Sequence, residues 1–216
     1  MRASAATSRV KATIDLAGLD ELRRKYSDPK YSGYARLKFL DIDQYLARNV
    51  AHAERLGLLG GPPRRILDLG SGCGYFPYVC RHFGHEVYCI DRPGMEVFDD
   101  MMALMGLDRI DMSIRPMVPL DLPWRDLDFV TGLMVKFDAI GENTRYGPDE
   151  WHFLISDLSR YLTPVAGLYF EFNKLPLCPE IEAANIAAFK RRGALVRGPG
   201  LVDVTISNVS EFLSHR

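Results

Sequence analysis

The sequence predicts an α/β protein with a mostly parallel β-sheet between two layers of helices. Short apolar runs bounded by glycine indicate buried strands, and the amphipathic segments between them, several of which end at a glycine, indicate helices. Two apolar runs near the C-terminus, joined by Gly-Pro-Gly at 198–200, indicate a closing hairpin. Alternating strands and helices imply right-handed crossovers, and the hairpin is expected to add an antiparallel strand at one edge.

The predicted elements follow one another without a repeat. Residues 1–33 are weakly patterned, and residues 34–56 carry apolar side chains at three- and four-residue steps that predict one long amphipathic helix. After a break at 60–63, strands are predicted at 65–69, 86–90, 111–116, 127–135 and 166–172. Helices are predicted at 75–83, 95–105, 149–162 and 180–192, and the hairpin strands at 194–197 and 201–206.

Length and composition indicate one ordinary globular domain with an extension. Domains run to about 100–200 residues, and the chain has 216, of which 47% are hydrophobic and 25% charged. These values exclude wholesale disorder, a collagen and a disulfide scaffold. We expect a helical extension or lid over residues 1–60 and the main domain over residues 61–216.

Charge and cysteine content exclude further classes. Lys and Arg number 27 against 28 Asp and Glu, which argues against a dedicated nucleic-acid-binding protein. The four cysteines form no C-x-x-C pair, so we expect reduced thiols and no metal site. No apolar run reaches the ~18 residues of a membrane span, and we expect a cytoplasmic protein. The Arg-, Ser- and Ala-rich start would also suit an organellar transit peptide.

The most informative stretch is a glycine-rich turn after the first predicted strand. Glycines stand at 70, 72 and 74, preceded by Asp68, in the pattern D-x-G-x-G-x-G. In open α/β sheets, ligands bind at the carboxyl ends of the strands. A dinucleotide fingerprint needs G-x-G-x-x-G, but Tyr75 stands where its last glycine would be. The turn therefore predicts a nucleotide site of another kind.

A second acid follows the second predicted strand. Asp91 ends the run Cys89-Ile90-Asp91, where a carboxylate can accept both hydroxyls of a ribose. The turn and Asp91 together predict an adenosine pocket that requires no pyrophosphate. The structural alternatives are a ligand-free turn for the glycines, a solvated acid for Asp91 and a turn contact for Asp68.

These residues resemble motif I of class I S-adenosylmethionine-dependent methyltransferases, over roughly residues 63–207. The resemblance implies a seven-stranded sheet in the order 3-2-1-4-5-7-6 with strand 7 antiparallel, and S-adenosyl-L-methionine as cofactor. It also implies that Asp68 faces the amino group of the cofactor and that Asp91 holds the ribose. The full predicted cofactor set is Asp68, Gly70, Ser71, Gly72, Gly74, Asp91, Arg92 and Met117.

One departure from the family concerns the adenine ring. Many members place an acid after strand three, whereas residues 114–119 contain none. Backbone carbonyls are expected to serve instead, with Met117 or Val118 packing on the base. Residues 127–130 (Leu-Asp-Phe-Val) resemble the F-D-x-V sequence at the start of strand four in the family.

Methyl transfer needs alignment above all, and a general base only where the acceptor loses a proton. We expect such a base after strand four or at the start of the next helix, with His152 and Asp138 as the candidates. For His152 the alternative is a helix-start residue with a satisfied side chain.

The acceptor is expected to be a small molecule, with saccharides among the candidates. The D/N-P-P-Y/F motif of amino-methylating nucleic-acid enzymes and the Pro-Cys nucleophile of cytosine C5 enzymes are both absent. Tyr34, Phe39 and Tyr45 of the long predicted helix are expected to pack over the cofactor cleft, unless they are plain core. The alternative functions are a non-catalytic S-adenosylmethionine-binding regulator or scaffold and a nicotinamide-dependent oxidoreductase.

Overall fold

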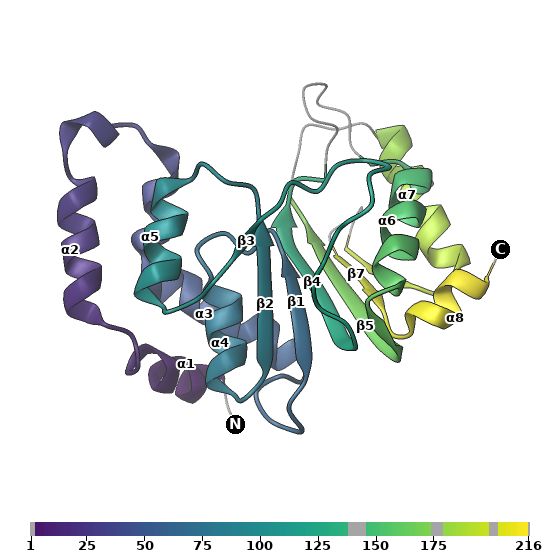
Figure 1. The fold of residues 1–216 in the computed structure, drawn as a ribbon, viewed down its shortest axis with the longest axis horizontal. Helices are drawn as coiled ribbons and strands as arrows, with labels where there is room; N and C mark the ends of the chain where they lie inside the picture. The colour runs from purple at the N-terminus through teal and green to yellow at the C-terminus, as the bar shows by residue number, and fades with distance from the viewer. Residues whose placement is uncertain (1–2, 138–145, 174–178, 199–202, 216) are drawn as a thin grey trace. The chain divides into compact units, whose positions relative to one another are not determined.

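A computed structural model describes residues 3–137, 146–173, 179–198 and 203–215. Its sheet contains β1 (Arg65–Leu69), β2 (Glu86–Asp91), β3 (Ile110–Asp111), β4 (Leu127–Val135), β5 (Leu162–Phe172), β6 (Leu195–Arg197) and β7 (Asp203–Ile206). The strand order is β3-β2-β1-β4-β5-β7-β6 (Figure 1). β7 pairs antiparallel with both β5 and β6. The predicted order and the antiparallel seventh strand are confirmed.

The α-helices are α1 (Ala3–Lys11), α2 (Leu16–Tyr26), α3 (Ile42–Arg55), α4 (Tyr75–His82), α5 (Glu96–Leu104), α6 (Pro148–Ser159), α7 (Pro179–Arg191) and α8 (Val209–Ser214). Two short 3₁₀ helices, η1 (Pro29–Tyr31) and η2 (Ala35–Leu40), precede α3. The four helices predicted after residue 63 all form, with ends within three residues of the prediction. The fold class is therefore confirmed.

The N-terminal prediction is wrong in two respects. Residues 1–33 are not merely weakly patterned, because they contain α1, α2 and η1. The single helix predicted over 34–56 is divided at Asp41, whose carboxylate accepts a hydrogen bond from the Gln44 N–H at 3.2 Å. Asp41 has non-helical backbone angles (φ −80°, ψ 84°), so it begins α3 as an N-cap.

The third strand and the C-terminus also differ from the prediction. β3 contains two residues rather than the predicted six, and the chain then turns at 115–118 with Met117 in the left-handed region at φ 57°. α8 was missed because it has only six residues, too few for a clear helical period. Its N-cap is Asn208, which accepts a hydrogen bond from the Glu211 N–H.

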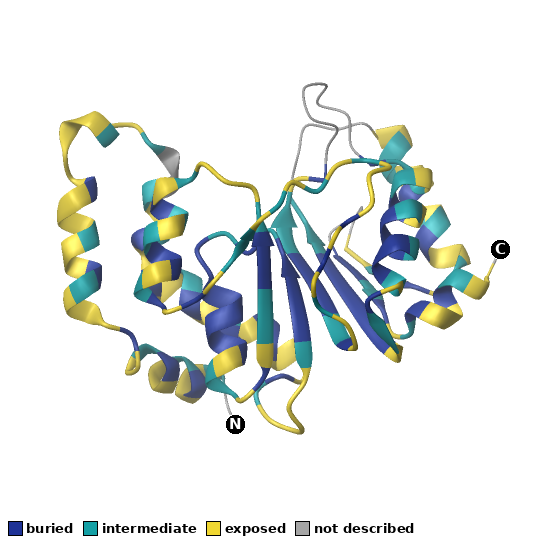
Figure 2. Cartoon of the chain, in the orientation of Figure 1, coloured by how far each residue is buried: buried dark blue, intermediate teal, exposed yellow. Residues whose placement is uncertain are grey.

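The chain forms two compact units, one of residues 1–63 with 71–111 and one of residues 64–70 with 112–216. In the first unit, α3 packs against α1 and α4, and α4 packs against β2. The apolar faces of these elements form its core, with Leu46, Val50, Val79 and Ile90 fully buried. α2 is mostly exposed, with only Leu19 and Tyr26 buried (Figure 2).

The second unit is built on β4 and β5, which pair in parallel. Trp151 of α6 is the centre of an aromatic core that includes Phe137 at 4.6 Å and Phe170 at 5.2 Å between ring centroids. Phe189 of α7 also packs on Trp151. The middle of β5 and the inner face of α6 are accordingly buried (Figure 2).

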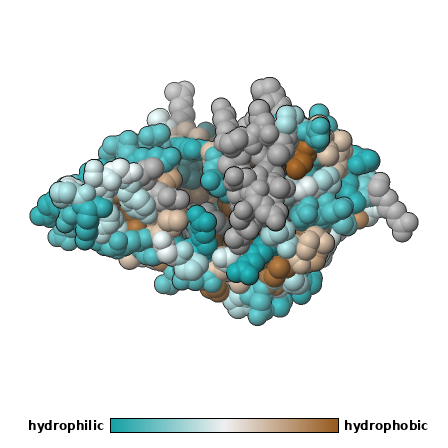
Figure 3. Space-filling model, turned by 90° about the horizontal axis from the view of Figure 1, so that it is seen from above, coloured by the Kyte–Doolittle hydropathy of each residue, from teal (hydrophilic) through white to brown (hydrophobic). Residues whose placement is uncertain are grey.

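The surface carries apolar side chains only at scattered positions. On the face drawn in Figure 3, hydrophilic residues predominate over the described part of the chain. Large apolar residues that are half exposed or more include Met117, Val165 and Leu195. None of the described helices combines the length and apolar character needed to cross a bilayer.

Candidate functional site

The glycine turn lies between β1 and α4, and Gly72 is the position whose surroundings are open. Gly72 has φ +54°, a conformation that favours glycine, and an added Cβ would meet only Phe98 Cε2 at 3.9 Å among the described residues. The backbone at Gly72 is therefore free for the close approach of a ligand.

The other two glycines of the turn have packing reasons. A Cβ on Gly70, in the second unit, would lie 2.6 Å from Val135 Cγ2. A Cβ on Gly74, in the first unit, would overlap the sulfur of Met102 and lie 2.7 Å from Leu107 Cδ1. Close packing thus accounts for two of the three glycines, whereas the left-handed backbone of Gly72 is accompanied by open space.

Asp91 at the end of β2 is tied to the turn. One carboxylate oxygen accepts a hydrogen bond from the Gly72 N–H at 2.8 Å, and the other accepts from the Arg92 N–H at 2.7 Å. The Ser71 N–H donates to the carbonyl of Ile90, which also joins the turn to β2. Each carboxylate oxygen has a further lone pair, so a partly buried Asp91 held in this way can still accept hydroxyl groups. Asp91 is not a freely solvated acid.

Two small side chains of the turn are buried. The Ser71 hydroxyl is buried and has no hydrogen-bond partner within the described part of the chain. Cys73 is a free, buried thiol. Burial, and then the charge of Asp91, raise the pKa of Cys73, which favours its neutral thiol form. Cys80 and Cys89 are also free and buried, while Cys178 lies outside the described residues.

Asp68 belongs to the second unit and is only 2% exposed. Its carboxylate accepts a hydrogen bond from the Thr131 hydroxyl at 2.6 Å, and the two residues are register partners in β1 and β4. This bond explains how a charged side chain is accommodated in a buried strand. The predicted role of Asp68 toward the amino group of the cofactor stays a prediction.

The structure describes one of the two candidate bases, His152, and the roles of both stay predictions. His152 is exposed in the first turn of α6 and lines a small pocket with Asn185 and Phe189 of α7 and Phe212 of α8. Asp138 lies outside the described residues. Among the residues that the structure describes, no group of three or more His, Cys, Asp or Glu is placed to hold a metal ion.

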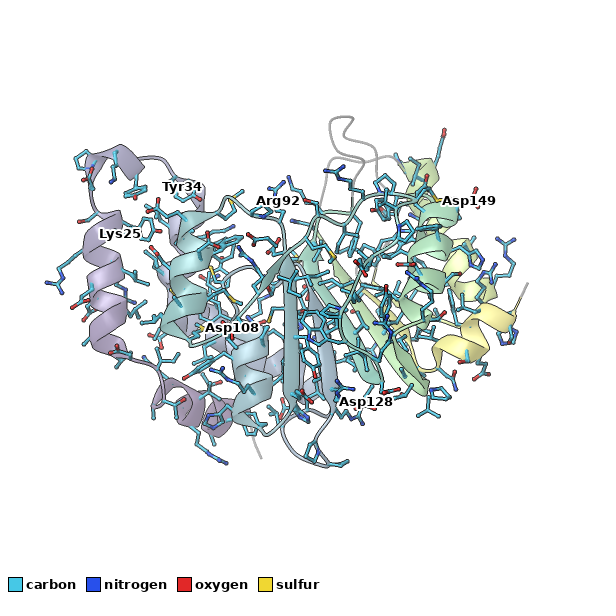
Figure 4. The ribbon with its side chains drawn as sticks, viewed as in Figure 1. Lys25, Tyr34, Arg92, Asp108, Asp128 and Asp149 are labelled. Atoms are coloured by element: carbon cyan, nitrogen blue, oxygen red, sulfur yellow. The ribbon has the colours of Figure 1, made fainter. Side chains whose placement is uncertain are left out.

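The remaining predicted cofactor residues lie at exposed positions. Arg92 follows Asp91 directly, and its side chain is exposed (Figure 4). Met117 in the second unit is 54% exposed at the left-handed position of its turn. Their contacts with a cofactor stay predictions.

Sequence reasoning named Phe39 and Tyr45 as aromatic residues over the cofactor cleft but missed the parts played by Tyr75 and Phe98. Tyr75, considered only as the residue that breaks the dinucleotide pattern, donates a hydrogen bond from its hydroxyl to the carbonyl of Phe39 at 2.6 Å. The Tyr45 ring stacks on Tyr75 at 5.7 Å, and Phe39 contacts Phe98 at 5.3 Å. The N-terminal extension therefore packs beside the glycine turn. A tyrosine directly after the last glycine was the available signal.

A polar cluster also joins the extension to α5. Lys25 Nζ lies 2.5 Å from Asp100 and 2.8 Å from Glu96, and the hydroxyls of Tyr26 and Tyr31 donate to the same two carboxylates. Hydrogen bonds from Lys25 and Tyr31 lower the pKa of Glu96, and the two carboxylates raise the pKa of Lys25. These five residues are called the polar clamp below.

Comparison with known proteins supports the fold. No family model matches the chain. A protein-L-isoaspartate O-methyltransferase of Alcanivorax borkumensis is 30% identical over 66 residues, a match that spans 30% of each chain. The PH0226 protein of Pyrococcus horikoshii covers 86% of this chain and 98% of its own, with 13% identity and a TM-score of 0.54. A SAM-dependent methyltransferase of Aquifex aeolicus has 20% identity and a TM-score of 0.49, over 80% of this chain and 95% of its own.

The strand order is the deciding observation. A seven-stranded sheet in the order 3-2-1-4-5-7-6 with an antiparallel seventh strand is the arrangement implied by the resemblance to class I methyltransferases. The Pyrococcus horikoshii structure shares that overall fold along most of both chains. The chain therefore has the Rossmann-like fold of the class I S-adenosylmethionine-dependent methyltransferases.

Proposed function

We propose that the protein is an S-adenosylmethionine-dependent methyltransferase with a small-molecule acceptor, with saccharides among the candidates. The observation that carries this proposal is the pair formed by Gly72 and Asp91. It combines backbone that is open to a ligand with a carboxylate held 2.8 Å from the Gly72 nitrogen. An added Cβ at Gly72 would meet no described atom closer than 3.9 Å, and we assign this open side of the backbone to the cofactor.

The residues present fit such a cofactor. Asp91 would accept the ribose hydroxyls, and the buried Ser71 hydroxyl would gain a hydrogen-bond partner that the described residues do not supply. The first N–H groups of α4 favour an anionic group such as the carboxylate of the methionine part. Asp68 and Gly70 would serve the same part, while Arg92 and Met117 would lie toward the adenine.

The bound cofactor supplies a methyl group on a positively charged sulfur, and the protein mainly has to align an acceptor with it. Alignment supplies a large share of the rate of such transfers. His152 and Asp138 remain the proposed bases for an acceptor that loses a proton. The assignment of residues 1–60 as an acceptor-binding extension and of residues 61–216 as the transferase domain belongs to the same proposal.

Calorimetric titration with S-adenosylmethionine and S-adenosylhomocysteine tests the proposal. Asp91→Ala should weaken both by about 1.5–3 kcal/mol, or roughly 10- to 150-fold, because it removes a charged acceptor from neutral hydroxyls. Asp111→Ala is the matched control, since Asp111 is the register partner of Asp91 on β3 but bonds to Arg109. Wild-type affinity in Asp91→Ala, with thermal unfolding unchanged, would contradict the proposed site.

A non-catalytic S-adenosylmethionine-binding protein is the second candidate. It is favoured by the lining of the small pocket at His152, which comes from α6, α7 and α8 and includes no residue of the predicted cofactor set. Transfer of a radioactive methyl group from S-adenosylmethionine to a component of a small-molecule extract would support the methyltransferase. Cofactor binding without any transfer would decide for the regulator.

A further inference from the structure

We propose that Phe39, Tyr45 and Phe98 form the surface that receives the methyl acceptor, and that this acceptor presents a ring with a hydroxyl group. This inference rests on the proposed function and names the chemistry of its second substrate. The three side chains are called the aromatic wall below. All three lie in the first unit, as do Gly72 and Asp91.

The wall begins at the open position of the glycine turn. The Phe98 ring is 3.9 Å from where a Cβ on Gly72 would stand. Phe98 contacts Phe39 edge-to-face at 5.3 Å, and Phe39 contacts Tyr45 at 4.7 Å between ring centroids. The three rings thus form a continuous series that starts at the backbone we assign to the cofactor.

Tyr75 contacts two members of the aromatic wall, Tyr45 and Phe39. Its ring is 4% exposed, stacks on Tyr45 with 22° between the ring planes, and its hydroxyl holds the carbonyl of Phe39. The ring of Tyr45 and the backbone of Phe39 are therefore held before any ligand binds, which lowers the entropy lost on binding.

Partial exposure separates the wall from ordinary core. Phe39, Tyr45 and Phe98 are each only partly buried, whereas Trp151 and Phe170 in the second unit are almost completely buried. Aromatic side chains usually bury their large apolar area, and those left partly open in a group commonly belong to recognition surfaces. The position of this group beside Gly72 indicates which ligand it meets.

The Tyr45 hydroxyl is the polar group of the wall. It makes no hydrogen bond to any other residue that the structure describes, in contrast to the hydroxyls of Tyr75 and Tyr78. Burial raises the pKa of Tyr45, so the group stays a neutral phenol that can both donate and accept. It is therefore a positioning residue for an acceptor hydroxyl rather than a general base.

Two kinds of molecule share the required chemistry. A phenolic ring stacks on aromatic side chains, and the apolar face of a saccharide packs on them in a similar way, while both carry hydroxyl groups for Tyr45. The experiment separates the two with 4-nitrophenol and methyl β-D-glucopyranoside as probes. Each is added to protein saturated with S-adenosylhomocysteine, and saturation-transfer NMR reports its dissociation constant.

We expect at least one probe to bind, and Tyr45→Phe to weaken it about three- to tenfold, because one neutral hydrogen bond is lost. Phe98→Leu should weaken it about two- to tenfold through loss of ring stacking. Tyr88→Phe is the matched control, since its hydroxyl bonds to Glu86 within β2, and it should leave binding unchanged. Binding of the phenol alone assigns an aromatic acceptor, and binding of the glucoside alone assigns a saccharide.

Two results would overturn the inference: neither probe binds, or a probe binds equally well to wild type, Tyr45→Phe and Phe98→Leu. The affinity for S-adenosylhomocysteine, measured first in each variant, keeps this failure distinct from that of the proposed function. If S-adenosylhomocysteine binds and the wall variants have no effect on probe binding, the proposed cofactor site is supported and the proposed acceptor surface is contradicted. If S-adenosylhomocysteine does not bind the wild-type protein, the proposed function is contradicted, and so is the acceptor surface that rests on it.

Discussion

The aromatic residues of the two units differ in how much of their surface is open. Around Trp151 in the second unit, rings pack on one another from several elements and are closed to solvent. Around Gly72 in the first unit, the rings of the aromatic wall remain partly exposed, and polar contacts hold the neighbouring segments together. The difference shows that the rings around Trp151 form a closed core, whereas the aromatic wall keeps part of its ring surface open to solvent.

Removal of the Trp151 ring from the core of the second unit should produce the largest loss of stability among these predictions. Trp151→Ala should lower the free energy of unfolding by about 3–5 kcal/mol, because a large buried side chain leaves a cavity. Denaturant unfolding followed by far-UV circular dichroism measures it. Trp124→Ala, at a partly buried position, is the control and should lower stability less. Equal losses in the two variants would remove the distinction between core and surface rings.

The glycine turn offers a paired test of packing against binding. Gly74→Ala combines a left-handed backbone at φ +79° with overlap on Met102, so it should destabilise by roughly 2–5 kcal/mol. Gly72→Ala carries the backbone strain alone and should destabilise by about 1–2 kcal/mol.

Binding should show the opposite order. Among folded molecules, Gly72→Ala should weaken the binding of S-adenosylhomocysteine more than Gly74→Ala does, because the new methyl group enters the open space. Thermal melts and calorimetry on both variants check the two orders. A Gly72→Ala protein with unchanged affinity would show that the open backbone is not used by the ligand.

The polar clamp should respond to pH and salt with a smaller effect. The pKa of Glu96 is lowered in the folded protein, so its contribution is present above the unfolded pKa and is lost as pH falls through the lowered value. The pKa of Lys25 is raised, so its contribution is present below the unfolded pKa and is lost only as pH rises through the raised value. The clamp is therefore complete near neutral pH and weakens in acid.

Amide hydrogen exchange over residues 16–34 measures this change. Exchange there should become several-fold faster at pH 3.5 than expected from the intrinsic pH dependence, and faster also in 1 M salt at pH 7, because exposed ion pairs are screened. Lys25→Met should remove most of the salt response, while Lys30→Met, outside the clamp, should retain it. A salt response that survives Lys25→Met would show that other contacts hold α2.

Local patterns were sufficient for most of the α/β core. The predicted strands at 65–69 and 127–135 match β1 and β4, because buried strands of a parallel sheet read as short apolar runs. The sequence did not reveal that α3 begins at Asp41, because the apolar period continues across this residue. An aspartate at a polar position of a helical pattern does not by itself indicate a helix N-cap. β3 was overestimated because β-branched and apolar residues at 112–118 lack pairing partners beyond Asp111.

The sequence by itself determined the order of strands and helices and the two features that indicate a cofactor, the glycine turn and Asp91. Both are local, since they depend on residue types that directly follow a strand. Tertiary structure alone decided that Asp91 holds the Gly72 N–H, that packing requires Gly70 and Gly74, and that Phe98 contacts Phe39, which in turn contacts Tyr45. Asp91 and Gly72 are 19 positions apart, Phe98 and Phe39 are 59, and Gly70 and Val135 are 65. The period of a sequence contains no information about which distant side chains will meet.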